Sequence, residues 1–429
     1  MGQPICPNQA QTDSFGPASQ SRDMIKAAMP SPKFMIAEFP LHSGYRISNA
    51  EEILTPALVL YPDVIASNIA RTLELLGGNA DRWRVHIKTA KLDYTVGMLI
   101  ERGIRQFKCA TTLELLMACQ NGAADVLVAY PIMGANARRV LEIASEFPRT
   151  RISVLAENES QVQQWHGSRV SVFLDINPGM NRTGIELQPN ERVLALVREI
   201  QNAGLEFRGL HYYDGQYGGV EEPERTRLAH EGYARLLELV FGISETGFTV
   251  PEVVTAGTPS FPASLSYDPF RKATFIHRVS PGTVVYHDAT SLAQLPDAYG
   301  YGPAALVLTR VVSRPYEGVI TCDAGHKSVS ADAGVPTCVV AGHPELTPLS
   351  PSEEHLPMKV SAPAGPRIGD LLYLIPRHVC PTVNNFDSAL LVKDGRVKSI
   401  EKVSARGHEG PLLKAHTHAD TQPSMVESR

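Results

Sequence analysis

A lysine that follows a short apolar run is the first candidate for covalent chemistry. Lys88 lies in the segment Arg84-Val85-His86-Ile87-Lys88-Thr89-Ala90-Lys91, at the end of a predicted strand. An amine becomes nucleophilic when burial or neighbouring cations lower its pKa, and Arg84, His86 and Lys91 supply such neighbours. Lys88 is therefore a candidate for Schiff-base formation with a carbonyl compound. A solvated basic turn is the alternative interpretation.

Two glycine-containing turns could hold the anionic parts of a ligand. Arg182 lies in the segment 175–184, where its planar set of donors could bind an anionic oxygen. Gly257 and Thr258 lie in the segment 255–260, whose small side chains suit backbone N–H groups that wrap a phosphate. An ordinary surface turn remains the alternative at both places.

A third constellation could bind a metal. His378 and Cys380 are two residues apart, so in an extended segment both side chains point to the same face. Imidazole and thiolate together suit zinc, and two protein ligands leave positions for substrate or water. The segments 323–327 and 352–355 add polar groups that could approach this pair or form ordinary turns.

The elements that must position these groups follow a repeating pattern from Thr55 onward. Short apolar runs alternate with segments whose apolar residues recur every three or four positions, which predicts strands and amphipathic helices. This rhythm predicts a parallel (β/α)8 TIM-like barrel over residues 41–280, and such barrels keep reactive groups at the carboxyl ends of their strands. The eight predicted strands are residues 57–60, 85–87, 107–109, 126–129, 152–155, 170–174, 210–212 and 253–255.

The pattern changes after about Pro281. Alternating and β-branched runs separated by Gly and Pro predict a mainly β domain over residues 281–405. The fold class expected is thus α/β, a barrel followed by a β domain, and residues 40–55 could pair with that domain. Residues 1–40 and 406–429 lack an apolar pattern, and we expect a loose N-terminal extension and a loose tail.

Composition favours an ordinary enzyme-sized protein with a small-molecule substrate. The chain has 429 residues, 43% of them hydrophobic, and a formal net charge of -5. This charge gives no reason to expect nucleic acid or an anionic membrane as partner. The six cysteines form no CxxC pair, and we find neither a leader pattern nor the roughly 18 consecutive apolar residues of a membrane span. We therefore expect a cytoplasmic protein with reduced thiols.

Eleven segments, taken in order, resemble the D-threonine aldolase and D-serine dehydratase family. The resemblance covers residues from about 45 to 403 and implies an alanine-racemase-like barrel that binds pyridoxal 5′-phosphate, followed by a β domain that binds a divalent metal (Zn, Mn or Mg). The segments are TPALVLYPD, RVHIKTAK, CATTLELLMA, VLVAYPIMG, NPGMNRTGIE, GLHYYDGQ, VVTAGTPSFP, SPGTVVYHD, DAGHKSVSAD, SEEH and GDLLYLIPRHVCPTVN.

The resemblance implies a role for each candidate residue. Lys88 would carry the cofactor, with Lys91 as the alternative attachment point. The other implied contacts are Arg182 with the ring oxygen, Tyr213 near the pyridine nitrogen, Gly257 and Thr258 with the phosphate, and His378 and Cys380 with the metal.

The resemblance leaves more than one reaction open. We favour aldol cleavage of a β-hydroxy D-amino acid to glycine and an aldehyde. Dehydration to a 2-oxo acid and ammonia is the first alternative, because the His378-x-Cys380 spacing looks like the dehydratases, whereas Tyr213-Asp214-Gly215 looks like the aldolases. A racemase and a non-catalytic cofactor-binding protein also stay open. The resemblance also implies a homodimer whose partner β domain closes each site.

Overall fold

The structure is a computed structural model that describes residues 39–187, 191–362 and 365–413. The expected N-terminal extension lies almost wholly outside the described residues. Of the expected tail, residues 406–413 are described, and Arg406 pairs with Asp387 at 2.7 Å and Glu409 with Arg139 at 2.9 Å. Within those residues, no helix has both the length and the apolar character needed to cross a membrane.

Eight parallel strands form the barrel, which confirms the predicted fold class. Trp83 bridges to Val279 and the Arg84 amide donates to the Val279 carbonyl at 3.0 Å, so the last strand meets the chain just before the first. In spatial order the strands are β2 (Val85–His86), β3 (Gln106–Cys109), β4 (Asp125–Val128), β5 (Arg151–Ala156), β6 (Ser171–Asn177), β8 (Phe207–Tyr212), β9 (Glu252–Thr255) and β10 (Ile276–Val279), with the short β7 (Ile185–Glu186) beside β6.

One of the eight predicted barrel strands was wrong. The run 57–60 forms β1 (Ala57–Leu60), which pairs with β11 (Ala305–Tyr316) and β17 (Ser388–Lys393) of the second sheet. The eighth barrel strand is instead β10, whose His277 and Arg278 interrupt the apolar pattern. Four apolar residues predict a strand but not the sheet that it joins.

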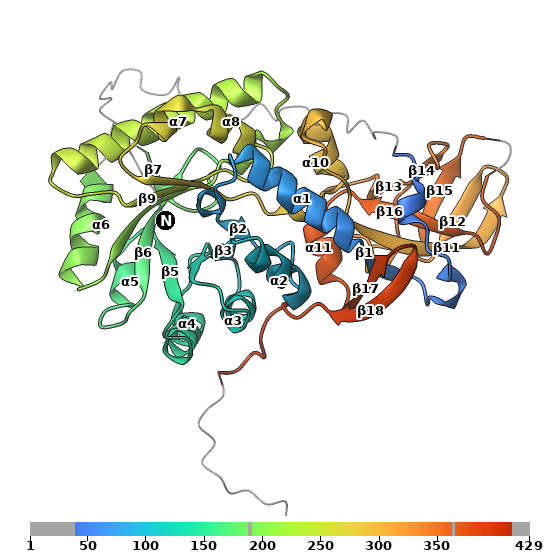
Figure 1. The fold of residues 1–429 in the computed structure, drawn as a ribbon, viewed down its shortest axis with the longest axis horizontal. Helices are drawn as coiled ribbons and strands as arrows, with labels where there is room; N and C mark the ends of the chain where they lie inside the picture. Colours follow the sequence, from blue (N-terminus) through green and yellow to red (C-terminus); the bar gives the residue numbers. More distant parts are fainter. Residues whose placement is uncertain (1–38, 188–190, 363–364, 414–429) are drawn as a thin grey trace, which may run out of the picture. The chain divides into compact units, whose positions relative to one another are not determined.

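Helices surround the barrel strands (Figure 1). The first begins at Pro62, whose fixed φ and missing N–H suit a first helical turn, and it buries Ile65 and Ile69 at a spacing of four. The helices are α1 (Pro62–Leu75), α2 (Asp93–Glu101), α3 (Thr112–Gln120), α4 (Gly134–Glu146), α5 (Glu159–Gln163), α6 (Glu191–Asn202), α7 (Glu224–Glu245), α8 (Phe261–Ser266) and α9 (Asp268–Arg271).

A layer of buried, charged side chains lies inside one end of the barrel. Arg84 lies between two carboxylates, 2.8 Å from Asp125 and 2.9 Å from Glu252. Glu252, whose side chain is fully buried, also pairs with Arg208 at 2.9 Å and with Arg278 at 2.5 Å. Each charge thus has a partner of opposite sign, although three arginines share only two carboxylates.

An apolar layer separates these charges from the opposite end of the barrel. The Phe173 ring faces the guanidinium groups of Arg84 and Arg208, each 5.7 Å from its centroid. Phe173 also belongs to a cluster whose other buried members are Leu127, Leu155 and Val254. This layer forms the floor on which the candidate site is built, since Leu155 also lines the pocket above it.

The second sheet is mainly β, as predicted. Its main path runs β14–β15–β12–β11–β1–β17–β18, and β16 pairs with both β11 and β13. Figure 1 shows β1, in blue, beside the red β17 and β18. Besides β1, β11 and β17, its strands are β12 (Val319–Cys322), β13 (Cys338–Val340), β14 (Leu346–Pro348), β15 (Leu356–Val360), β16 (Leu371–Pro376) and β18 (Arg396–Lys402), and two short helices, α10 (Ala289–Gln294) and α11 (Val379–Asn384), complete the fold.

Candidate active site

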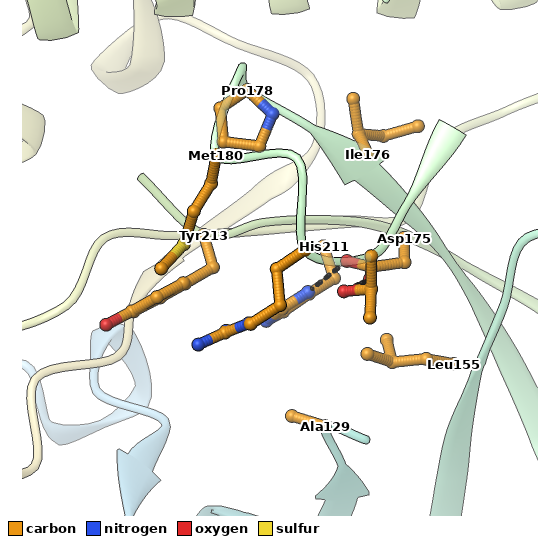
Figure 2. A pocket seen from close by; sticks show the side chains of 10 residues that line it. Ala129, Leu155, Asp175, Ile176, Pro178, Met180, His211 and Tyr213 are labelled. Carbon is orange, nitrogen blue, oxygen red and sulfur yellow. Dashed lines mark hydrogen bonds and ion pairs between the residues drawn. The ribbon is translucent and has the colours of Figure 1, made fainter. Parts of the chain in front are cut away.

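A pocket opens at the carboxyl ends of β4, β5, β6 and β8. It encloses about 310 Å³, counting the space open to solvent. Figure 2 shows Asp175, His211 and Tyr213 along its wall, with Leu155 and Ala129 on the other side. The position agrees with the rule that barrel enzymes place ligands at this end.

Two of the predicted cofactor residues, Arg182 and Tyr213, meet in this pocket. The Arg182 guanidinium lies over the Tyr213 ring, 5.1 Å from its centroid. Gly257 packs against the same ring, since a Cβ at this position would lie only 2.9 Å from Tyr213 Cε2. The turns after β6, β8 and β9 therefore converge, as expected from the sequence.

The turn after β9 has the features of a phosphate site. Thr258 is buried, and its Oγ1 has no hydrogen-bond partner among the described residues. A buried hydroxyl without a partner costs about 1–3 kcal/mol, which an anionic ligand oxygen would offset. The residues present therefore fit the phosphate of pyridoxal 5′-phosphate.

A buried carboxylate holds the turn after β9 in place. Asp214 is fully buried and accepts hydrogen bonds from Ser260 Oγ and Tyr233 Oη, both at 2.5 Å. Burial raises the Asp214 pKa, and the hydrogen bonds from the two hydroxyls and from the Gly257 amide oppose that shift. Asp214 directly follows Tyr213, so these hydrogen bonds connect the end of β8 with the turn that contains Gly257.

The two candidate lysines differ in what surrounds them. Lys91 Nζ is buried and donates to Glu114 Oε1 at 2.8 Å and to the Ala405 carbonyl at 3.3 Å. Lys88 is half-buried, two residues after β2. Its positive charge acts on groups from both parts of the fold, lowering the pKa of Lys108 in the barrel and of Cys380 at α11. The geometry favours Lys88 as the available amine.

A chain of buried polar groups lines the barrel beneath the pocket. Lys108 Nζ lies 3.3 Å from His211 Nε2, and His211 Nδ1 lies 2.7 Å from Asp175 Oδ1 (Figure 2). Burial, followed by the charge of Lys88, lowers the Lys108 pKa to about 7. Burial and then Lys108 also lower the His211 pKa, so its imidazole is neutral and can accept at Nε2 while donating from Nδ1 to Asp175.

The predicted metal pair lies at the start of α11. Cys380 Sγ is 3.0 Å from the hydroxyl of Thr89, the residue after Lys88, so this pair lies beside the predicted attachment lysine. Burial opposes the charged form of both side chains. Their mutual contact outweighs it, raising the His378 pKa to about 9 and holding the Cys380 pKa below its usual value. A readily ionised thiol beside an imidazole fits a zinc-type cation.

The part of the chain that the structure describes contains no group of three His, Cys, Asp or Glu side chains arranged to hold a metal. The sequence predicted only two protein ligands. The segments 323–327 and 352–355 pair with each other, since the Gly325 amide donates to Glu354 at 3.0 Å and the His326 amide to Ser352 at 2.9 Å. The two segments are therefore turns that pair with each other through backbone hydrogen bonds.

Comparison with known proteins identifies the family. Residues 61–290 match the sequence profile described as "Alanine racemase, N-terminal domain", which is more than half of the 429 residues. The chain belongs to the alanine racemase N-terminal domain family. Residues 304–392 match a second profile, "Putative serine dehydratase domain". These matches confirm the family resemblance found in the sequence motifs.

Several relatives align with most of this chain. The chain is 28% identical to a D-threonine aldolase of an Arthrobacter species over 377 residues, covering 82% of this chain and 93% of that one. It is 25% identical to a 3-hydroxy-D-aspartate aldolase of Paracoccus denitrificans over 397 residues, covering 85% and 97%. Among solved structures, D-threonine aldolase from Filomicrobium marinum aligns with a TM-score of 0.76 at 26% identity, covering 87% and 99%.

The motifs of this racemase-type barrel had not pointed to several of the residues at the site. Lys108 was hidden because it interrupts an otherwise apolar run, and His211 lay within a predicted strand. Asp214 and Asp332 belong to the motifs quoted above but had no assigned contact. In a predicted inner strand, a charged residue flanked by apolar ones is the signal that could have indicated Lys108.

Proposed function

We propose that the protein is a lyase dependent on pyridoxal 5′-phosphate and a divalent metal, of the D-threonine aldolase type. Its substrates would be β-hydroxy D-amino acids and its products glycine and an aldehyde. The observation that carries the proposal is the contact between the two predicted centres: the hydroxyl of Thr89, the residue after Lys88, lies 3.0 Å from Sγ of Cys380 in the metal pair. The names of the related aldolases support the same substrate class.

The residues of the pocket would hold the cofactor in a fixed orientation. Arg182 would bind the ring oxygen, Tyr213 would lie near the pyridine nitrogen, and Thr258 would donate to the phosphate. When bound, the cofactor supplies an electron sink for bonds broken at the substrate Cα. In an aldol cleavage the β-hydroxyl loses its proton and the Cα–Cβ bond breaks, so Cα must then gain a proton, which Lys88 Nζ would deliver. His211, whose imidazole is neutral, would add no positive charge to the site.

The pair at α11 would act on the substrate hydroxyl. His378 and Cys380 would hold a divalent cation, which supplies positive charge that lowers the pKa of a nearby hydroxyl. Their place beside Thr89 brings this charge close to Lys88. The chain would in this way act on Cα and on the β-oxygen within one site.

Dehydration is the second candidate. The metal pair has a cysteine, which resembles the dehydratase pattern, and a D-threo-3-hydroxyaspartate dehydratase of a Delftia species is a relative at 22% identity. In that reaction Lys88 Nζ would remove the α-proton while hydroxide leaves from Cβ. The same residues would serve both reactions, so products must distinguish them.

The division into residues 41–280 and 281–405 and the homodimer expected from the resemblance are further parts of this proposal. Light scattering coupled to size-exclusion chromatography measures the mass directly. A mass of about one 46.7 kDa chain would contradict the dimer.

The deciding experiment is product analysis with D-threonine and D-serine on holoenzyme loaded with metal. Glycine and acetaldehyde, lost in both Lys88→Ala and His378→Ala, would support the aldolase. Pyruvate or 2-oxobutyrate with ammonia would make the protein a dehydratase. Retained cofactor absorbance without turnover of either substrate would contradict a lyase on these amino acids and favour a racemase or a non-catalytic protein.

The attachment site can be tested without mutation. Borohydride reduction fixes the cofactor to its lysine, and peptide mass mapping then locates it. We expect the label on Lys88, because Lys91 is held by Glu114. A label on Lys91 would overturn the assignment. In the product analysis, Lys272→Ala is the control for Lys88→Ala: it removes an exposed lysine that does not line the pocket, and it should keep full activity.

A further inference from the structure

His378 has a carboxylate partner that the proposed reaction does not use. Asp332 Oδ2 lies 2.6 Å from His378 Nδ1. Asp332 ends the motif 323–332, in the loop between β12 and β13, and its other oxygen accepts from Ser330 Oγ at 2.8 Å. The Ser330 amide in turn donates to Thr382 Oγ1, at 3.2 Å, on α11. The loop and the helix that follows His378 are therefore joined at several points.

This contact decides which ring nitrogen of His378 can bind a cation. An ionised carboxylate only accepts hydrogen bonds, so Nδ1 must carry the hydrogen and donate it to Asp332. Nε2 is then the ring nitrogen left to bind a metal, which would take the place of any proton on it. A carboxylate or carbonyl on the second nitrogen is the common way in which proteins fix the tautomer and the ring direction of a metal-binding histidine.

A second carboxylate fixes the backbone of the same segment. Asp288 is buried, and its Oδ2 accepts from the Val379 amide at 3.0 Å while its Oδ1 accepts from the Ser291 amide at 2.8 Å. Asp288 immediately precedes α10, so it ties the residue between His378 and Cys380 to the end of the barrel. Asp288 thus holds the backbone between His378 and Cys380, and Asp332 holds the His378 ring.

We propose that Asp332 is a positioning residue that directs Nε2 of His378 towards the cation shared with Cys380. This inference rests on the metal pair of the proposed function. It assigns the carboxyl end of the DAGHKSVSAD motif to the metal site, although Asp332 itself does not bind the metal. The expected effect of losing such a partner is a 10–100-fold weaker metal affinity.

The test measures zinc affinity rather than turnover. Metal-free holoenzyme is titrated with Zn²⁺ against a chromophoric chelator, for the unmodified protein and for Asp332→Asn, Asp332→Ala and His378→Ala. We expect about tenfold weaker binding in Asp332→Asn, whose amide oxygen can still accept from Nδ1. We expect about 100-fold weaker binding in Asp332→Ala and far greater loss in His378→Ala.

Asp394→Asn serves as the matched control. It makes the same chemical change at an exposed residue, and its φ of 53° is one that Asn also adopts readily. Its zinc affinity should equal that of the unmodified protein. Far-UV circular dichroism and cofactor absorbance show whether each variant is folded.

Cobalt gives a second readout that a purely structural role would not change. The thiolate charge-transfer band of a Co²⁺-loaded protein reports on Cys380, and the ligand-field bands report on the geometry around the ion. In Asp332→Asn we expect the charge-transfer band to remain and the ligand-field bands to shift. Identical ligand-field bands together with unchanged zinc affinity in both Asp332 variants would overturn the inference.

The outcomes separate this inference from the proposed function. If His378→Ala binds zinc as tightly as the unmodified protein, the metal pair itself is wrong. If His378→Ala loses zinc but Asp332→Ala does not, only the role of Asp332 is wrong. If Asp332→Ala loses zinc as completely as His378→Ala, Asp332 is a direct ligand and the positioning role is also refuted.

Discussion

Replacing Lys108 with methionine removes a positive charge from the inside of the barrel while keeping a side chain of similar length. The lysine is 2% exposed, and its Nζ contacts His211 at 3.3 Å. Burial and the nearby Lys88 lower its pKa from the ordinary 10.5 to about 7. The substitution therefore tests whether the layer beneath the pocket opposes protonation as strongly as its surroundings indicate.

The size of the effect follows from these two pKa values. The difference between 10.5 and about 7 corresponds to about 5 kcal/mol, at about 1.4 kcal/mol for each tenfold change. Between these pH values the unfolded chain binds more protons at Lys108 than the folded chain, so this residue makes the protein more stable as pH rises. Below pH 7 the full cost of the charged amine opposes folding, and above about 10.5 the cost is absent.

The assay compares the free energy of urea unfolding for cofactor-free protein and Lys108→Met from pH 6 to 9.5. The variant should be the more stable protein at pH 6, by up to about 5 kcal/mol, and its advantage should fall by about 2 kcal/mol between pH 7 and 9. Groups shared by both proteins cancel in the difference. The exposed Lys272→Met should show no such trend. A stability difference that is independent of pH would refute the reasoning, because Lys108 would then stay protonated throughout.

Three further substitutions test other parts of the barrel. Glu252→Gln should lower the free energy of unfolding by about 3–5 kcal/mol, measured from the urea midpoint, because it leaves three arginines with too little compensating charge; a loss below about 1 kcal/mol would contradict this. Thr258→Val should raise the dissociation constant for pyridoxal 5′-phosphate about 5–10-fold in fluorescence titrations, since it keeps the shape but removes the donor, and an unchanged constant would exclude Thr258 from the phosphate site. Gly257→Ala should displace the Tyr213 ring and weaken cofactor binding further, whereas absorbance titrations matching the unmodified protein would show that the turn can adjust.

Much of the arrangement of the candidate site could be read from the sequence because parallel strands place their ends together. Lys88, Arg182 and Gly257 each follow an apolar run, and in a barrel the ends of such runs converge on one face. The spacing of His378 and Cys380 indicated a shared direction for a similar local reason. Spacing along the chain was thus enough to predict which side chains share a face, because strands and barrels repeat one regular geometry.

The contacts that depend on distant segments could not be read in this way. Asp332 and His378 come from a loop and a helix start whose meeting depends on the packing of the second sheet. The pairing of Lys91 with Glu114 likewise joins the turn after β2 to α3. The motif favoured Lys88 over Lys91 as the attachment point, but the physical reason, the ion pair that holds Lys91, depends on the tertiary structure.

The position of β1 has a consequence for how the chain is made. β1 leaves the ribosome early, yet its neighbours in the sheet, β11 and β17, follow the whole barrel. At about 5–20 residues per second, the roughly 330 residues between Leu58 and Leu391 take about 15–65 s to synthesise. Until β11 and then β17 have been synthesised, the edges of this apolar strand lack their native partners. Moving residues 39–60 to the carboxyl end, by circular permutation, would shorten that exposure and should raise the soluble yield.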